Sequence, residues 1–157
     1  MADELEENAP GSAYKIVMAS WRDLSEVREI ENVCFPQDAW PLFDMLGALT
    51  FPGTVRFKAV LGGKIVGFVA GDIRRYQKTG WIATICVLPE FRNHGIGKAL
   101  LLKCEQAMEM PRVKLSVRMS NQEAINMYRR NGYQDAGRWP RYYRGGEDAL
   151  VMEKVLA

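Results

Sequence analysis

The feature that most constrains the fold is an apolar run at residues 81–88 that passes directly into a glycine-containing loop and then a helix. A run without polar alternation is typical of a strand buried on both faces of a sheet. After the loop, Ile96, Leu100, Cys104 and Met108 recur every four residues, which is the spacing of one helix face. A doubly buried strand followed by an amphipathic helix predicts an α/β protein.

The remaining periodicity completes a single domain. Strands are predicted at residues 14–18, 55–61, 65–73, 113–117, 133–137 and 149–155. The other helices are predicted between Ser20 and Pro36, between Pro41 and Pro52, and between a Ser120–Glu123 capping box and Gly132. The resulting order, βααβββαβαββ, predicts a mixed sheet of about seven strands flanked by about four helices. Residues 1–12 are polar and are interpreted as a flexible tail ahead of one domain at residues 13–157.

Composition narrows the classes of partner. Of 157 residues, 48% are hydrophobic and 25% charged, and the formal net charge is +2. Four carboxylates and no basic residue stand in the first thirteen positions, which leaves 21 basic and 15 acidic residues, or +6, for the rest. A moderately cationic body suits a small anionic ligand. It lacks the strong basic excess of an obligate nucleic-acid binder, so nucleic acid is not the expected partner.

Membrane, disulfide and zinc classes are not expected either. No apolar run approaches the ~20 residues of a membrane span, and the acidic start lacks the features of a secretory signal, so we expect a cytoplasmic protein. The three cysteines are odd in number and widely spaced, which argues against a disulfide framework or a CxxC metal site. His94 is the single histidine, which leaves too few ligands for a catalytic zinc ion.

The loop at residues 92–97, RNHGIG, has the composition of an anion site. Its backbone N–H groups meet the positive end of the dipole of the helix that follows. Gly95 and Gly97 remove side chains where a phosphate must approach, while Arg92 and Lys98 add positive charge at the rim. The spacing of the glycines differs from that of the Rossmann loop and of the P-loop. Binding of a pyrophosphate without a metal ion is the remaining interpretation.

With this loop the chain resembles the GNAT superfamily of acyl-CoA-dependent N-acetyltransferases, whose phosphate loop reads Arg/Gln-x-x-Gly-x-Gly/Ala between a strand and a helix. The resemblance runs from about residue 14 to the C-terminus and is closest to N-terminal acetyltransferases of the RimI type. The matching groups, in order, are Cys34-Phe35-Pro36 with Trp40 and Phe43, Ile85-Cys86-Val87-Leu88-Pro89, Val117-Arg118-x-Ser120-Asn121, Ala124 with Tyr128 and Gly132-Tyr133, and Tyr142-Tyr143 with Glu147-Asp148-Ala149 and Met152.

The resemblance implies acetyl-CoA as co-substrate, no metal, and a sheet that splays between its fourth and fifth strands. The acceptor it implies is the N-terminal α-amino group of a protein or peptide, for which a ribosomal protein is one candidate. The positions that match the family's acetyl-CoA contacts are Ile85, Cys86, Val87, Arg92, Asn93, His94, Gly95, Ile96, Gly97, Lys98, Asn121 and Tyr128. The positions that match its acceptor contacts are Phe35, Pro36, Tyr142 and Tyr143.

Transfer of an acetyl group from a thioester to an amine needs a proton for the departing thiolate. Tyr128 matches the family's general acid, although its place on a helix is also that of an ordinary core aromatic residue. Asn121 lies seven residues earlier and therefore on the same helix face, about 10 Å away along the axis. This pair can span part of a pantetheine arm.

The general base is where this chain departs from the resemblance. RimI-type enzymes carry Glu at the position of Ser116, and some relatives carry His or Tyr at that of Trp81. Either a water chain held by Ser116 accepts the proton, or a carboxylate does, with Glu31 and Asp38 as candidates that otherwise read as surface charges. An α-amine with pKa near 8 costs only about 1.4 kcal/mol to deprotonate at pH 7, which favours N-terminal acceptors.

Two alternatives to an N-terminal acetyltransferase remain open. A small-molecule amine acetyltransferase would have a deeper closed pocket and no use for paired tyrosines on a loop. A CoA-binding sensor or scaffold without catalysis is suggested by the residues at 116 and 81, and Tyr128 argues against it. The oligomeric state does not follow from the sequence.

Overall fold

The computed structural model describes residues 13–39 and 41–156. The predicted tail at residues 1–12, Trp40 and the side chain of Phe43 lie outside the described part. Within it the strands are β1 (Lys15–Met18), β2 (Thr54–Leu61), β3 (Lys64–Arg74), β4 (Thr79–Val87), β5 (Arg112–Arg118), β6 (Gln134–Trp139) and β7 (Ala149–Val155). The helices are α1 (Leu24–Cys34), α2 (Leu42–Thr50), α3 (Ile96–Met108) and α4 (Gln122–Arg130), with short 3₁₀ turns at Trp21–Asp23, Arg75–Gln77 and Pro89–Phe91. The predicted α/β class and element order are confirmed.

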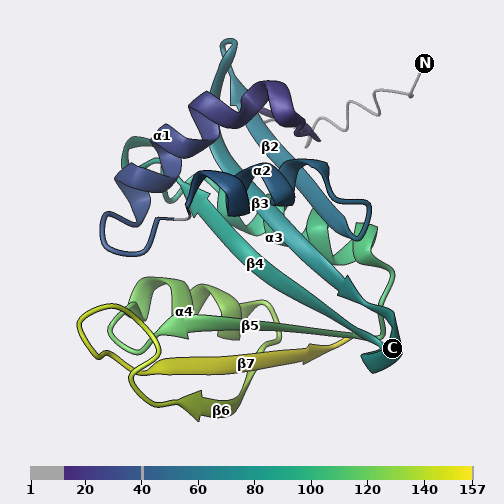
Figure 1. Ribbon diagram of the computed structural model, residues 1–157, viewed down its shortest axis with the longest axis vertical. Coiled ribbons are helices and arrows are strands. Elements are labelled where there is room, and N and C mark those ends of the chain that lie inside the picture. The colour runs from purple at the N-terminus through teal and green to yellow at the C-terminus, as the bar shows by residue number, and fades with distance from the viewer. Residues whose placement is uncertain (1–12, 40, 157) are drawn as a thin grey trace.

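All seven strands form one sheet in the order β1-β2-β3-β4-β5-β7-β6. Neighbours are antiparallel except β4 and β5, which are parallel and pair only through residues 79–82 and 112–115. Beyond Ile82 and Leu115 the two strands separate, and Figure 1 shows the sheet dividing there into two wings. The splay that the family resemblance implies is therefore present, and it leaves one edge of β4 at residues 83–87 without a strand partner.

Helices cover both faces of the sheet (Figure 1), and an apolar core lies between the helices and the sheet on each face. On one face, helices α1 and α2 cover β3 and β4 with Val27, Ile30, Met45 and Leu49. On the other face, α3 and α4 pack against the sheet, and Leu100, Leu101 and Cys104 of α3 are fully buried. A Cβ atom at Gly71 would lie 2.7 Å from Met108 Sδ, so glycine lets α3 approach the strands closely. Side chains of β4 reach both cores, since Ile82 and Val87 belong to one and Cys86 and Leu88, just past the end of the strand, to the other. Ile82 and Cys86 lie on opposite faces despite their even spacing, because the pairing of β3 with β4 shifts register between Ala70 and Gly71.

Two local predictions are wrong for tertiary reasons. The N-cap of α4 is Asn121, whose side chain accepts a hydrogen bond from Ala124 N at 3.3 Å. Ser120 is instead held by Glu147, which accepts from both its amide (2.9 Å) and its hydroxyl (3.0 Å). The sixth strand also continues past its predicted end at residue 137 to Trp139, which pairs with Ala149.

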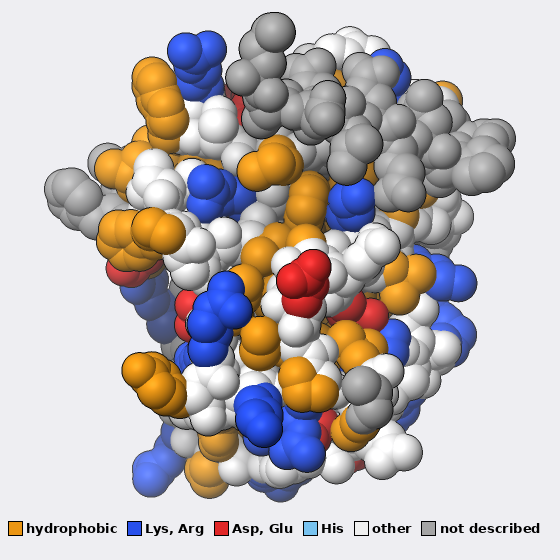
Figure 2. All heavy atoms as spheres, turned by 90° about the vertical axis from the view of Figure 1, so that its right-hand side faces the viewer, with side chains coloured by type: hydrophobic (Ala, Val, Ile, Leu, Met, Phe, Trp, Pro, Cys, Tyr) orange, Lys and Arg blue, Asp and Glu red, His pale blue; other side chains and the backbone are white. Residues whose placement is uncertain are grey.

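Four general properties complete the description. The described cysteines are free thiols. No helix in the described part is long and apolar enough to cross a membrane, and no group of three or more His, Cys, Asp and Glu residues there could hold a metal ion. On the face shown in Figure 2, lysine and arginine side chains are scattered among hydrophobic and polar ones and do not gather into one patch.

Candidate active site

Two hollows meet where β4 and β5 separate. The first, of about 450 Å³, lies between the α1–α2 turn and the β6–β7 loop, and the second, of about 730 Å³, runs from β4 and α4 to the start of α3. Residues common to both linings are Phe35, Asp38, Ile85, Arg118, Asn121, Ala124 and Tyr128. The splay thus gives two molecules access to the same point from different sides of the sheet. We call the two joined hollows the passage.

The second hollow ends at the glycine loop, whose amides are unpaired. Among the described residues none accepts a hydrogen bond from the backbone N–H groups of residues 93–98, and the first such bond of α3 runs from Ala99 N to Gly95 O at 3.0 Å. Gly95 precedes α3 with a φ of +81°, a left-handed conformation that strains any residue with a Cβ. Six free donors at a helix N-terminus fit a pyrophosphate without help from a cation.

Contacts within the loop fix its shape. Arg92 Nε donates to Val87 O at 3.0 Å and so ties the loop to the end of β4. His94 Nδ1 lies 2.8 Å from Arg92 O, so its ring folds back onto the loop. Of the predicted acetyl-CoA contacts, His94 is the one absent from the lining of the second hollow. The others line it: Ile85, Cys86, Val87, Arg92, Asn93, Gly95, Ile96, Gly97, Lys98, Asn121 and Tyr128.

Tyr128 stands at the junction of the two hollows. Its side chain is 6% exposed, and its ring meets that of Tyr133 edge-on at 5.8 Å. Among the described residues the Tyr128 hydroxyl has no hydrogen-bond partner. Burial raises its pKa above the ordinary value, so the hydroxyl stays protonated as a donor across the neutral range. Geometry and protonation state both suit delivery of a proton to a leaving thiolate.

The β6–β7 loop forms one wall of the first hollow. Tyr143 OH donates to Ser116 Oγ at 3.4 Å, so the hydroxyl predicted to hold a water has a protein partner in this structure. Tyr142 packs edge-on against Tyr143 at 5.0 Å and is 55% exposed at the rim. Trp81, which replaces a polar residue of some relatives, stacks on Trp139 at 5.7 Å outside the lining of either hollow.

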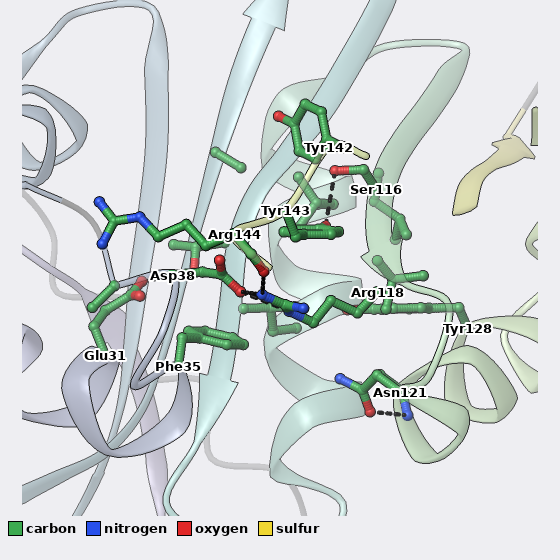
Figure 3. A pocket seen from close by; sticks show the side chains of 18 of the residues that line it. Glu31, Phe35, Asp38, Ser116, Arg118, Asn121, Tyr128, Tyr142, Tyr143 and Arg144 are labelled. Carbon is green, nitrogen blue, oxygen red and sulfur yellow. Dashed lines mark hydrogen bonds and ion pairs between the residues drawn. The ribbon is translucent and has the colours of Figure 1, made fainter. Parts of the chain in front are cut away.

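Arg118 at the end of β5 joins the two loops that flank the first hollow (Figure 3). Its guanidinium contacts Asp38 Oδ2 at 2.6–2.7 Å and Glu147 Oε1 at 2.9 Å, and it also donates to Arg144 O at 3.1 Å. Its carbon CZ lies 4.8 Å from the centre of the Tyr143 ring. We call these contacts the Arg118 clasp. The sequence pattern Val117-Arg118-x-Ser120 was matched as a motif, but this function of the arginine was missed.

The two carboxylates considered as bases differ sharply. Asp38 is engaged by the Arg118 clasp. Glu31, which reads as a surface charge from its type, is in fact 1% exposed. Its Oε1 accepts from Thr84 Oγ1 at 2.7 Å, and its Oε2 is buried without a partner among the described residues. Burial raises the pKa of Glu31, while the bond from Thr84 acts in the opposite direction. Phe35 lines both hollows and Pro36 only the second.

Three features occur together here: an open mixed sheet, a loop of unpaired amides before α3, and two hollows that meet from different sides of the sheet. Together they define a class of protein, the acyl-CoA-dependent transferases. The chain matches the "Acetyltransferase (GNAT) family" over residues 16–133 and belongs to that family. It is 30% identical to an "N-alpha-acetyltransferase" of Sulfurisphaera tokodaii (98% of this chain, 99% of that protein). It is 29% identical to the "N-terminal acetyltransferase A complex catalytic subunit NAA10" of Arabidopsis thaliana (85% and 73%). The solved "ribosomal-protein-S18-alanine N-acetyltransferase" of Escherichia coli, at 24% identity, shares the fold with a TM-score of 0.82 over 92% of this chain and 94% of that one.

Proposed function

We propose that this GNAT protein transfers the acetyl group of acetyl-CoA to the N-terminal α-amino group of a protein or peptide, by direct attack of the amine on the thioester. The observation that carries the proposal is the two-sided passage, with a phosphate loop on one side and a cleft between two aromatic-rich loops on the other. The relatives named for N-terminal acetylation, which cover nearly the whole chain, support the same acceptor class.

Each part of the passage has a task in this proposal. The amides of residues 93–98 bind the pyrophosphate of CoA, with Lys98 as a nearby positive charge. The unpaired edge of β4 at residues 83–87 offers backbone groups to the pantetheine arm, in the manner of a missing strand. Tyr128 donates the proton that the thiolate of CoA needs as it leaves. Asn121, which caps α4, lies beside both hollows and contacts the same arm.

The acceptor enters the first hollow between Phe35 and the paired tyrosines. Tyr142 is exposed at the rim and packs on Tyr143, whose hydroxyl is held by Ser116, and this aromatic wall suits an extended peptide whose first residue reaches inward. The Arg118 clasp keeps the two walls at a fixed separation. The proposed partner is a protein N-terminus in the cytoplasm, and ribosomal proteins are one class to test.

A small-molecule acceptor is the competing function. The aromatic rim of the first hollow, with Tyr142 55% exposed, favours a peptide that extends out of the site over a fully enclosed metabolite. A non-catalytic CoA sensor would not require a buried, protonated Tyr128 beside the passage.

The experiment is incubation of the protein with acetyl-CoA and a peptide library varied in its first three residues, read by mass spectrometry. Matched peptides with blocked N-termini and free amino acids are included as acceptors. We expect acetylation of free N-termini and loss of the signal when these are blocked. Acetylation of free amino acids alone would overturn the proposal in favour of the small-molecule function.

A further inference from the structure

The first hollow contains a buried acid that the proposed function does not yet use. Glu31 lies on α1, one helical turn before Phe35, and faces the sheet with 1% of its surface exposed. Thr84 of β4 fixes Oε1 at 2.7 Å, which orients the carboxylate, and leaves Oε2 with no partner among the described residues. A buried carboxylate oxygen without a partner is costly, and a catalytic role or a bound ligand is one physical reason for its presence.

The position of Glu31 relative to Tyr128 gives this oxygen a task. Both residues line the first hollow, and Figure 3 shows them on opposite sides of it, with Phe35 below and Tyr143 above. Glu31 is a buried residue of α1, whose Val27 and Ile30 belong to the core under α1 and α2, whereas Tyr128 belongs to the core under α3 and α4. Tyr128, as the acid on the CoA side, and the Glu31 carboxylate on the acceptor side therefore lie on either side of the point where the amine would attack the thioester.

We propose that Glu31, oriented by Thr84, binds the α-ammonium group of the acceptor and takes its proton. The inference rests on the proposed function for the identity of the amine. It assigns the base that Ser116 and Trp81 cannot supply, and it adds Thr84 as a positioning residue.

The proton balance of the reaction then closes without a further reagent. Glu31 as carboxylate accepts one proton from the ammonium, and the neutral amine forms a C–N bond to the acetyl carbonyl as the C–S bond breaks. The departing thiolate takes the proton of the Tyr128 hydroxyl. The nitrogen, which is cationic once the C–N bond has formed, releases its second proton to solvent. Solvent then returns a proton to Tyr128 and removes one from Glu31, so the net products are the acetylated amine, CoA thiol and one proton.

The charges around Glu31 are compatible with this task. The charge of Glu31 acts on two thiols, Cys34 on its own helix and Cys86 on β4, and raises the pKa of both. A hydrogen bond from Cys86 is the main cause that lowers the pKa of Cys34 to about 7. Of the charged residues that line the hollow, Arg118 is paired with Asp38 and also with Glu147 in the clasp, and Arg144 is exposed at the rim. An entering ammonium is therefore the cation that fits the free Oε2.

The test is Glu31→Gln, which keeps the side-chain volume and an acceptor for Thr84. We expect kcat/KM at pH 7 to fall at least about 100-fold, with the Kd for CoA unchanged. The wild-type pH profile should show an inflection that stays in place for peptides whose α-amines differ in pKa. In Glu31→Gln the inflection should move with the pKa of the amine, and the difference between the two enzymes should narrow at high pH, where the amine is already neutral.

If Glu31 had only a structural role, Glu31→Gln would lower the melting temperature and reduce the rate equally at every pH. We expect a different result. Burial raises the pKa of Glu31 in the folded protein. The folded state therefore loses stability as the pH rises from the ordinary pKa of a glutamate through the raised pKa of Glu31. Glutamine removes that loss, and we expect Glu31→Gln to melt no lower than wild type at pH 8. Thr84→Val should reduce kcat/KM by a smaller factor than Glu31→Gln does, and it should shift the inflection of the pH profile.

Two matched controls separate the outcomes. Glu29→Gln, on the exposed side of the same helix, should change neither rate nor profile. Glu105→Gln replaces another buried carboxylate, held by Tyr133 and Lys154, and should lower the melting temperature without moving the inflection. A Glu31→Gln enzyme with wild-type rate and profile, or with a loss equal at every pH and a lower melting temperature, overturns the inference. If wild type acetylates only free amino acids, the proposed function fails while Glu31 is tested on that amine; if it acetylates no primary amine, both fail.

Discussion

Replacing Tyr128 with phenylalanine separates chemistry from packing at the centre of the passage. The substitution removes one hydroxyl and keeps the ring that meets Tyr133 at 5.8 Å. Because that hydroxyl has no partner among the described residues, its loss leaves no buried donor or acceptor behind. We therefore expect the free energy of unfolding to change by less than about 0.5 kcal/mol, and the affinity for CoA to remain nearly unchanged.

The effect on turnover should be much larger than the effect on stability. A positioned general acid contributes about 10² to 10⁴ in rate, so kcat should fall by at least about 100-fold, or about 2.7 kcal/mol of activation free energy. Burial raises the pKa of Tyr128 above its ordinary value, so the wild-type hydroxyl stays protonated throughout a neutral assay range. The ratio of wild-type to variant kcat should accordingly be constant from about pH 6 to 9.

The assay follows release of the CoA thiol with a peptide acceptor, with single-turnover mixing to show that chemistry limits the rate. Tyr133→Phe is the matched control in the same aromatic pair. Its hydroxyl donates to the buried Glu105 at 2.8 Å, so its removal should cost about 1–3 kcal/mol of stability and leave kcat unchanged. A Tyr128→Phe enzyme that turns over at the wild-type rate would show that Tyr128 is only a packing residue.

Three further predictions address the other parts of the site. Gly95→Asp puts a side chain at a φ of +81° and a negative charge among the free amides. Calorimetry should therefore show at least a tenfold (~1.4 kcal/mol) loss of CoA affinity, and an unchanged affinity would refute phosphate binding by this loop. Arg118→Met removes the ion pairs of the clasp with Asp38 and Glu147, so KM for the peptide should rise by a larger factor than kcat falls. A loss in kcat alone would contradict the proposal that Arg118 positions the two walls of the first hollow. In the Glu31→Gln enzyme, which lacks the proposed base, a peptide with a blocked α-amine and an internal lysine should be acetylated roughly 250-fold more slowly at pH 7 than a matched peptide with a free α-amine, because the pKa difference of ~2.4 units leaves that much less neutral amine. Equal rates for the two peptides would exclude selection by amine ionisation.

The parts of the site that the sequence could predict are those whose chemistry is local. The phosphate loop is six consecutive residues, and its glycines, its arginine and the helix behind it are all visible within one short window. The strands and helices followed from periodicity, and the resemblance supplied the splay. The capping box failed because Glu147, 27 residues away, competes for Ser120. A local rule cannot anticipate a partner that arrives through the tertiary fold.

The carboxylate chemistry was harder to predict because it depends on distant contacts. Thr84 is 53 residues from Glu31, and Arg118 is 80 residues from Asp38. One signal was nevertheless present, since Glu31 lies four residues after Val27 and three before Cys34, on the apolar face of its helix. Residue type suggested an exposed charge, whereas position indicated burial, and position was the better guide.

The incomplete pairing of β4 with β5 connects these observations. An unpaired strand edge is ordinarily a liability, because its free N–H and C=O groups invite association with another chain. Here the edge lies along the passage, since residues 83–85 line the first hollow and residues 85–87 the second. If β5 continued to pair along β4, the sheet would separate Glu31 on one face from Tyr128 on the other, and no single amine and thioester could lie between them. In the proposed reaction the two proton-transfer groups approach from opposite faces, so the gap in the sheet is a requirement of that proposal.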